Sequence, residues 1–129
     1  AKKKMAVELY SYGTYTRWDN QSKKLPKLTN VTVLVVIEPG VEFGYVLKIK
    51  GAKGKVLSYR IDHPQMWDET GVELPPFEGD YFINSNDYEF FLGDTVWEPY
   101  AQMQGEWELT TSCDGSILAK KKFRLVLPV

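Results

Sequence analysis

Two tryptophan–carboxylate pairs are the residues of this sequence best placed to bind another molecule. Trp67 precedes Asp68, and Trp97 precedes Glu98, with Tyr100 two residues further along the chain. Both pairs fall in stretches without strand alternation, where a flat ring can stack on a sugar or grip a peptide. Core packing is the competing explanation for each single ring, because large aromatic side chains are usually buried. We predict that these five residues form an amphipathic binding patch.

Carboxylates are plentiful in the same middle region, and two of them at a suitable spacing would be enough for a glycosidase-type hydrolase. A domain of this size has little room for a deep cleft, however, and solvated loop acids explain the same composition. The sequence also contains no nucleophile motif. We therefore expect no enzymatic activity and keep a small hydrolase as an alternative. The acids in question are Asp68, Glu69, Glu73, Glu78, Asp80, Asp87, Glu89, Asp94 and Glu98.

The single histidine and the single cysteine limit metal chemistry. His63 and Cys113 cannot by themselves assemble a Cys/His zinc site, and the oxygen-bearing residues between 80 and 87 lack the spacing and the glycine of an EF-hand loop. We interpret His63 as a residue that caps a loop at the end of a strand. The charge of Asp114 would raise the pKa of the Cys113 thiol, so we interpret this cysteine as a small apolar residue. We predict that the domain needs no metal and no cofactor.

The charge balance argues against anionic partners. Lys plus Arg number 16 and Asp plus Glu number 17, so the formal net charge is -1 and no nucleic-acid or membrane partner is expected. The basic runs Lys2–Lys4 and Lys120–Lys122 lack a phosphate-binding motif, and we interpret the second as a solvated strand edge. The apolar run Val31–Ile37 is too short to span a bilayer. The lone cysteine and the alternating start Ala1–Val7 favour a cytoplasmic protein, with secretion or periplasmic export after signal cleavage as the alternative.

Strand alternation accounts for most of the remaining sequence. The β-branched run Val31–Ile37 favours a strand, and so does the alternating segment Leu57–Ile61. Between them, turn signals at Glu38–Gly40 and Gly51–Gly54 flank a longer strand. We predict a hairpin that extends into a three-strand meander. The buried face of the middle strand is expected to carry Val41, Phe43, Tyr45, Leu47 and Ile49.

Further strands are expected at both ends of the chain. Near the start, Val7 and Leu9 alternate before Gly13, which we interpret as a β-bulge, and residues 19–30 have the composition of a surface connection. Near the end, strands on both sides of Asp114–Gly115 form a tight hairpin, with Trp107 in the core. Short aromatic strands are expected around residues 81–83 and 88–92.

These elements add up to about seven strands in 129 residues, without a helical period. This pattern favours an all-β fold, an immunoglobulin-like antiparallel β-sandwich that forms a single domain over residues 1–129. A small barrel is the alternative topology.

Several segments also resemble an uncharacterised bacterial domain family, in order and over nearly the whole chain. The closing pattern of Gly, Trp, a strand, a Gly hairpin and Phe is similar to the last hairpin of many immunoglobulin-like domains. The resemblance implies that fold and a bacterial source, and it implies no catalytic residue and no ligand. The segments are Tyr12–Tyr15, Pro39–Gly44, Ile61–Pro64, Phe91–Pro99, Gly105–Leu109, Asp114–Gly115 and Phe123.

Three functions remain open at this point. We favour a non-catalytic module that binds a protein or peptide partner through the loop-rich region Pro64–Met103 or an exposed sheet edge. The first alternative is a carbohydrate-binding module, which requires exposed indoles at Trp67 and Trp97 beside Asp68 or Glu98. The second alternative is the small hydrolase, which requires two acids with raised pKa values in one pocket.

Overall fold

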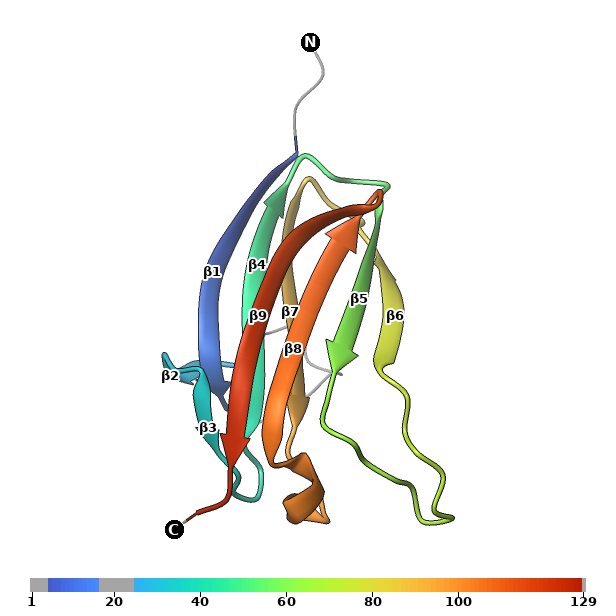
Figure 1. The fold of residues 1–129 in the computed structure, drawn as a ribbon. Coiled ribbons are helices and arrows are strands. Elements are labelled where there is room, and N and C mark those ends of the chain that lie inside the picture. The colour runs from blue at the N-terminus through green and yellow to red at the C-terminus, as the bar shows by residue number, and fades with distance from the viewer. Residues whose placement is uncertain (1–4, 17–24, 129) are drawn as a thin grey trace.

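The computed structural model describes residues 5–16 and 25–128. These residues form nine strands and one short 3-10 helix, packed as two face-to-face sheets (Figure 1). No helix among them is long and apolar enough to cross a membrane. The elements are β1 Ala6–Tyr15, β2 Leu28–Asn30, β3 Leu34–Val36, β4 Glu42–Lys50, β5 Val56–Asp62, β6 Phe77–Phe82, β7 Asp87–Thr95, η1 Tyr100–Met103, β8 Gly105–Cys113 and β9 Ser116–Val126.

The strand order is β2-β1-β4-β7 in one sheet and β3-β9-β8-β5-β6 in the other. Every pair is antiparallel except β3 with β9, which is parallel. The two-layer, all-β prediction is confirmed, with nine strands in place of about seven. One unexpected strand, β2, lies in the stretch interpreted as a surface connection, of which residues 19–24, like Lys2–Lys4, lie outside the described part of the chain.

The predicted three-strand meander is wrong, because its members belong to different sheets. β4 pairs with β1 and β7, whereas β3 pairs with β9 and β5 lies between β8 and β6. The turn at Glu38–Gly40 therefore carries the chain from one sheet to the other. Val35 and Ile37 are buried against β4 in the core between the sheets. A turn signal shows that the chain reverses, but it does not show whether the two strands share a sheet.

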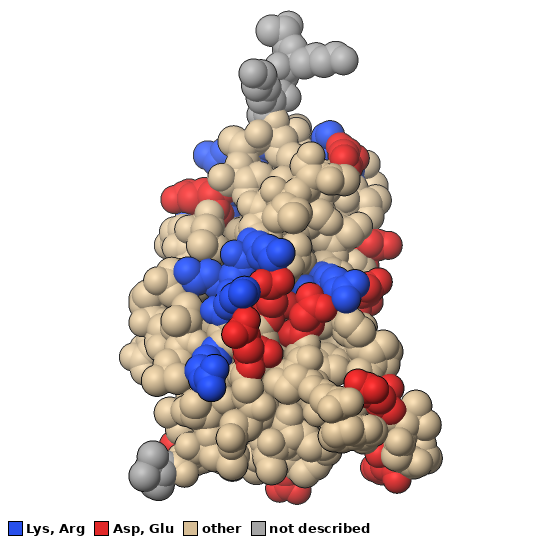
Figure 2. Space-filling view, viewed as in Figure 1, with Lys and Arg blue, Asp and Glu red and all other residues tan. Residues whose placement is uncertain are grey.

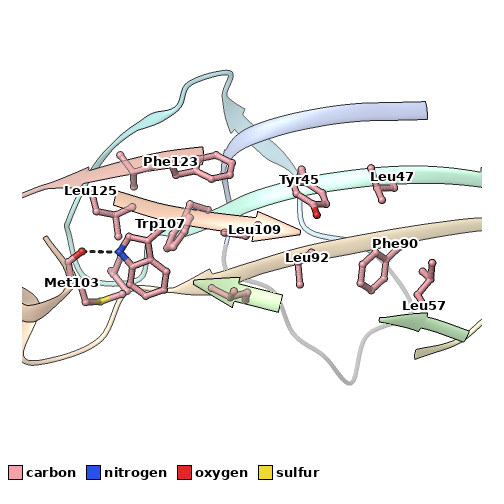
Figure 3. Packing of buried hydrophobic residues seen from close by; sticks show 14 of the residues in the cluster. Tyr45, Leu47, Leu57, Phe90, Leu92, Met103, Trp107, Leu109, Phe123 and Leu125 are labelled. Atoms are coloured by element: carbon pink, nitrogen blue, oxygen red, sulfur yellow. Dashed lines mark hydrogen bonds between the residues drawn. The ribbon is translucent and has the colours of Figure 1, made fainter. Parts of the chain in front are cut away.

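The core lies between the inner faces of the two sheets, as strand alternation requires. On β4, the side chains of Phe43, Tyr45, Leu47 and Ile49 are fully buried, which confirms four of the five residues of the predicted face; Val41 lies just before the strand and is half-buried. Trp107 of β8 is also fully buried, as expected (Figure 3). Its ring meets that of Phe43 edge to face, with the ring centroids 5.3 Å apart. The tight hairpin between β8 and β9 is confirmed as well, with positive φ values at Asp114 and Gly115.

One buried hydrogen bond joins the two sheets. The hydroxyl of Tyr45 on β4 lies 2.6 Å from Oγ1 of Thr111 on β8, and both residues are fully buried. Burial raises the pKa of Tyr45. We expect Tyr45→Phe to lower the free energy of unfolding by about 1–2 kcal/mol, because Thr111 is left without its partner. Denaturant unfolding measures this loss, and the double variant Tyr45→Phe/Thr111→Val should recover part of it. A loss in the double variant equal to the sum of the losses in Tyr45→Phe and Thr111→Val alone would show that the hydroxyl pair is not coupled.

A row of glycines crosses the four-stranded sheet. Gly13 of β1 is paired with Gly44 of β4, which is paired with Gly93 of β7. The interpretation of Gly13 as a bulge is wrong, since β1 shifts register between Leu9 and Ser11 against β4 and between Thr14 and Tyr15 against β2. Gly13 is required because β2 approaches the main chain of β1 closely at this position. A Cβ on Gly13 would lie 1.8 Å from the backbone oxygen of Asn30 on β2. The strands of this sheet therefore approach each other more closely at the row than side chains permit.

Oppositely charged side chains form a band across the five-stranded sheet (Figure 2). Lys120 and Lys122 belong to this band, on a part of β9 beyond the residues that pair with β3, whereas Lys121 between them points to the other face of the strand. Lys120 forms a salt bridge with Glu108 of β8, and the ammonium of Lys121 lies over the Tyr12 ring. The run therefore faces acidic and aromatic neighbours, in agreement with its interpretation as a solvated strand edge.

Candidate functional site

The loop between β5 and β6 carries the first predicted pair, Trp67 and Asp68. Its chain folds back on itself, and a backbone bridge joins Trp67 to Glu73. The carboxylate of Asp68 closes the turn, because its Oδ1 accepts bonds from the N–H and hydroxyl of Thr70 and from the N–H of Val72, at 2.7–3.0 Å. These hydrogen bonds lower the pKa of Asp68. The sequence places Asp68 in the binding patch, but the structure also gives it a role in shaping the loop.

The segment after β7 carries the second pair, Trp97 and Glu98, and leads into η1. The N–H of Trp97 donates to Sδ of Met103 at 3.0 Å, and the Nε1–H of Trp107 donates to the Met103 carbonyl at 2.8 Å (Figure 3). Met103 therefore anchors this segment to the core. Gln102 of η1 reaches the other loop, where its Oε1 accepts the N–H of Trp67 at 2.8 Å. These contacts hold the two loops together at one end of the sandwich, where Figure 1 shows both.

A groove of about 760 Å³ lies between these two segments, and we call it the end groove. Four of the five predicted residues line it, namely Trp67, Asp68, Trp97 and Glu98. Tyr100 does not line it and is half-buried against the core. The remaining lining residues are Met66, Glu69, Thr70, Leu74, Pro99 and Gln102.

The two indoles of the end groove are not equivalent. Trp67 is 44% exposed, whereas Trp97 packs against the core, with its ring 6.1 Å from that of Phe77 and 6.0 Å from that of Trp107. The carbohydrate alternative requires two exposed indoles, and only Trp67 meets that requirement. The groove thus offers one open aromatic face and one ring held in place by its neighbours.

The carboxylates of the end groove do not match the hydrolase pattern. Asp68, Glu69 and Glu98 are all exposed, and the pKa of Asp68 is lowered, which is opposite to the direction that a general acid needs. No three His, Cys, Asp or Glu side chains within residues 5–16 and 25–128 are grouped so as to hold a metal ion. The arrangement favours recognition through apolar surface and negative charge.

A second cavity of about 370 Å³ lies between β5 and β6 of one sheet and β7 of the other, and we call it the inter-sheet cavity. It shares Trp97 with the end groove. Aromatic rings dominate its lining, and its one carboxylate is that of Asp94. The residues that line it are Tyr59, Ile61, Phe77, Tyr81, Phe91, Leu92, Gly93, Asp94 and Trp97.

Asp94 has the most perturbed carboxyl group in the described structure. Its Oδ1 accepts the N–H of Thr95 at 2.8 Å. Burial raises the pKa of Asp94 to about 7; the Thr95 hydrogen bond opposes this rise, the carboxylate of Glu42 adds to it, and His63 opposes it. Perturbed carboxyl groups in cavities are common at functional sites. The sequence analysis named Asp94 only as one of nine acids considered for a hydrolase, although its place on the same strand face as Phe90 and Leu92 was a usable signal for a buried carboxyl group.

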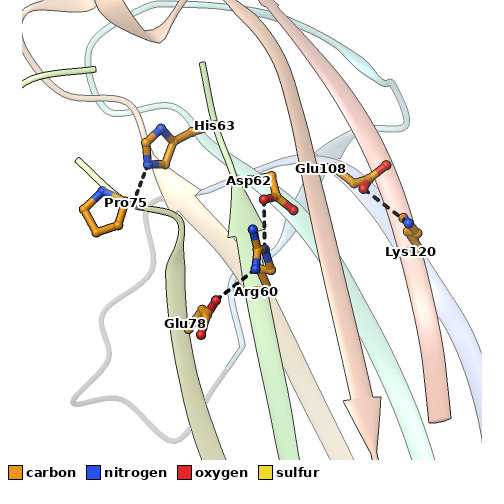
Figure 4. Close-up of polar contacts among 7 residues, drawn as sticks. All are labelled: Arg60, Asp62, His63, Pro75, Glu78, Glu108 and Lys120. Carbon is orange, nitrogen blue, oxygen red and sulfur yellow. Dashed lines mark hydrogen bonds and ion pairs between the residues drawn. The ribbon is translucent and has the colours of Figure 1, made fainter. Parts of the chain in front are cut away.

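His63 and Cys113 have the structural roles expected of them. The two ring nitrogens of His63 lie 2.6 Å and 2.8 Å from the carbonyl oxygens of Pro64 and Pro75, so the ring joins the two ends of the β5–β6 loop (Figure 4). Cys113 is buried at the end of β8, and burial, followed by the charge of Asp114, raises the pKa of its thiol. Both interpretations are confirmed.

Two packed sheets with this core define an immunoglobulin-like β-sandwich. An immunoglobulin-like protein from Pseudomonas aeruginosa has a similar structure, with a TM-score of 0.76 and 19% sequence identity, over 98% of this chain and 99% of that chain. At this identity the similarity establishes the fold alone. The model of a family described as a domain of unknown function (DUF3859) matches residues 3–125, so the chain belongs to this family. A comparison with curated proteins finds no match.

Proposed function

We propose that this domain is a non-catalytic module that binds an extended segment of a protein partner in the end groove. The observation that carries the proposal is the combination of buried apolar side chains and exposed acids in one groove. Met66 is buried and Leu74 is half-buried, whereas Asp68, Glu69 and Glu98 are exposed. Loops at the end of a rigid sandwich are a common place for such sites.

The charge of the end groove restricts the partner. Its lining includes three carboxylates and no Lys, Arg or His. The β5–β6 loop, residues 63–76, likewise has no Lys or Arg. A segment with basic residues beside an apolar or aromatic residue therefore complements the groove in both charge and surface. The expected anchor on the domain is Trp67, because indoles at the centre of an interface often dominate the binding energy.

A peptide-display selection tests this proposal directly. We expect wild-type domain to enrich peptides that combine basic and apolar residues, and Trp67→Ala to bind them at least roughly tenfold more weakly. The backbone N–H of Trp67 still reaches Gln102 in this variant, so the loop should keep its shape. Val72→Ala is the matched control, because Val72 is exposed on the same loop and does not line the groove. Peptides that bind Trp67→Ala as tightly as wild type, or no enrichment by wild type, would contradict the proposal.

Carbohydrate binding is the second candidate, and the open face of the Trp67 ring favours it. A sugar stacked on this ring would find acceptors in Glu69, Glu98 and Oδ2 of Asp68, because only Oδ1 of Asp68 is used by the three hydrogen bonds of the turn. A glycan array with wild type and Trp67→Ala distinguishes the two candidates. Glycan binding that depends on Trp67, together with no peptide enrichment, would replace the first proposal with the second.

A further inference from the structure

We propose that the inter-sheet cavity binds an organic ammonium group, with the carboxylate of Asp94 as its counter-ion. This site is separate from the end groove, although Trp97 borders both. The proposal does not depend on peptide binding in the end groove, and it is tested with different variants.

The first argument is the position of Asp94 in its strand. Side chains of β7 alternate between the two faces of the sheet, and Phe90, Leu92 and Asp94 share the face that points toward the other sheet. Folding therefore moves the carboxyl group of Asp94 from water into an apolar environment, which disfavours its charged form. Among the described residues, no Lys or Arg lines the cavity or forms a salt bridge with Asp94. A cation supplied by a ligand would stabilise the carboxylate.

The second argument is the aromatic lining. The rings of Tyr59 and Tyr81 lie 5.7 Å apart with planes tilted by only 30°, and those of Phe77 and Trp97 lie 6.1 Å apart. Two ring pairs around one carboxylate supply the faces that attract ammonium groups through cation–π interactions. The Tyr59 ring is seated over Gly79, where a Cβ would lie 2.7 Å from its atoms. The glycine thus leaves room for this ring at the wall of the cavity.

The electrostatic surroundings are negative. Burial and then the charges of Tyr81, Asp94 and Asp80 raise the pKa of Tyr59, which keeps its phenol neutral. The titratable groups nearest to Asp94 on the neighbouring elements are Glu42 on β4, His63 after β5, and the tyrosines of β5 and β6; the Glu42 carboxylate accepts the hydroxyl of Thr95. Among the side chains that act on Asp94, His63 lowers its pKa, and both nitrogens of the His63 ring already contact carbonyl oxygens. This environment favours a positively charged ligand.

Choline serves as the probe, and dimethylbutanol, in which carbon replaces the ammonium nitrogen, is its neutral isostere. NMR titration at about pH 8 and constant ionic strength measures both affinities. We expect choline to bind wild type in a saturable way, and Asp94→Asn to bind it roughly tenfold or more weakly. Affinity should also rise with pH as Asp94 ionises. Asp87→Asn, which changes an exposed acid of the same strand, is the matched control and should bind like wild type.

Tyr81→Leu provides a second test, because Tyr81 is 43% exposed and its replacement leaves the buried core in place. We expect a severalfold loss of choline affinity in this variant. The proposal fails if choline does not bind wild type, if dimethylbutanol binds as tightly as choline, or if Asp94→Asn keeps the wild-type affinity. Trp67→Ala should leave choline binding unchanged, so this proposal and the one for the end groove fail independently.

An alkylammonium group reaches such a site either as a free small molecule or as a lysine or methylated lysine side chain of a protein. A peptide that carries trimethyl-lysine separates the two sources in a competition experiment with choline. Tighter binding of the peptide identifies a protein side chain as the better ligand. Tighter binding of choline identifies a free amine, and both results require the Asp94 carboxylate.

Discussion

The Asp94→Asn variant is expected to be more stable than wild type above neutral pH. The pKa of Asp94 is raised to about 7 in the folded protein, against a model-peptide value of 3.8. The folded state therefore binds more protons than the unfolded state between these two values, and wild-type stability falls as the pH rises through this range. Because the amide introduced by Asp94→Asn does not ionise, the free energy of unfolding of the variant does not decrease in this way as the pH rises. We expect it to be more stable by roughly 1–3 kcal/mol at about pH 9.

Unfolding with denaturant at several pH values measures this difference. The gap between the two proteins should be absent near about pH 4, open between about pH 4 and pH 7, and stay constant at higher pH. Asp87→Asn should show no such gap, because Asp87 is exposed at the start of the same strand. A gap that does not depend on pH would mean that the Asp94 carboxyl titrates normally, and it would remove the electrostatic support for the ammonium site.

Gly44→Ala is expected to cause a large loss of stability, because the added methyl group on β4 would meet the main chain of β7. A Cβ on Gly44 would lie 2.1 Å from the backbone oxygen of Leu92 and 2.6 Å from Cα of Gly93. Both atoms belong to the main chain of β7, which cannot rotate away as a side chain does. Strands β4 and β7 would have to separate, and we expect a loss above about 3 kcal/mol or a failure to fold.

Gly40→Ala is the matched control for this experiment. Gly40 has a φ of +81°, so alanine is strained there too, but nothing lies within 4 Å of the added Cβ. We expect Gly40→Ala to cost about 1–2 kcal/mol from backbone strain alone. Similar losses in the two variants, measured by denaturant unfolding, would show that the close approach of β4 and β7 contributes nothing. Asp94 follows Gly93 directly, so the row of glycines also positions the inter-sheet cavity.

The candidate site was predictable in part. The sequence shows two tryptophan–carboxylate pairs outside the strand pattern, and the structure brings both into the end groove. The turn formed around Asp68 and the attachment of Trp97 to Met103 were not predictable, because each depends on atoms that only the folded loop brings together. Asp94 was named only among the nine acids of the hydrolase alternative, and not in the binding patch, for a related reason. Its carboxyl group is unusual only because the opposite sheet covers it.

The sequence by itself determined most of the strand segments, though not β2, and the buried face of the clearest strand. Alternation along β4 predicts the inward row Phe43, Tyr45, Leu47 and Ile49, because a strand with one buried face must repeat every two residues. Only the tertiary structure decided which strands pair, since β3 joins β9, far away in the chain, and leaves its neighbour β4 to the other sheet. Hydrophobic alternation identifies the buried face of a strand, but it does not identify the strand with which it pairs. The pairing depends on how the two sheets pack against each other around one shared core.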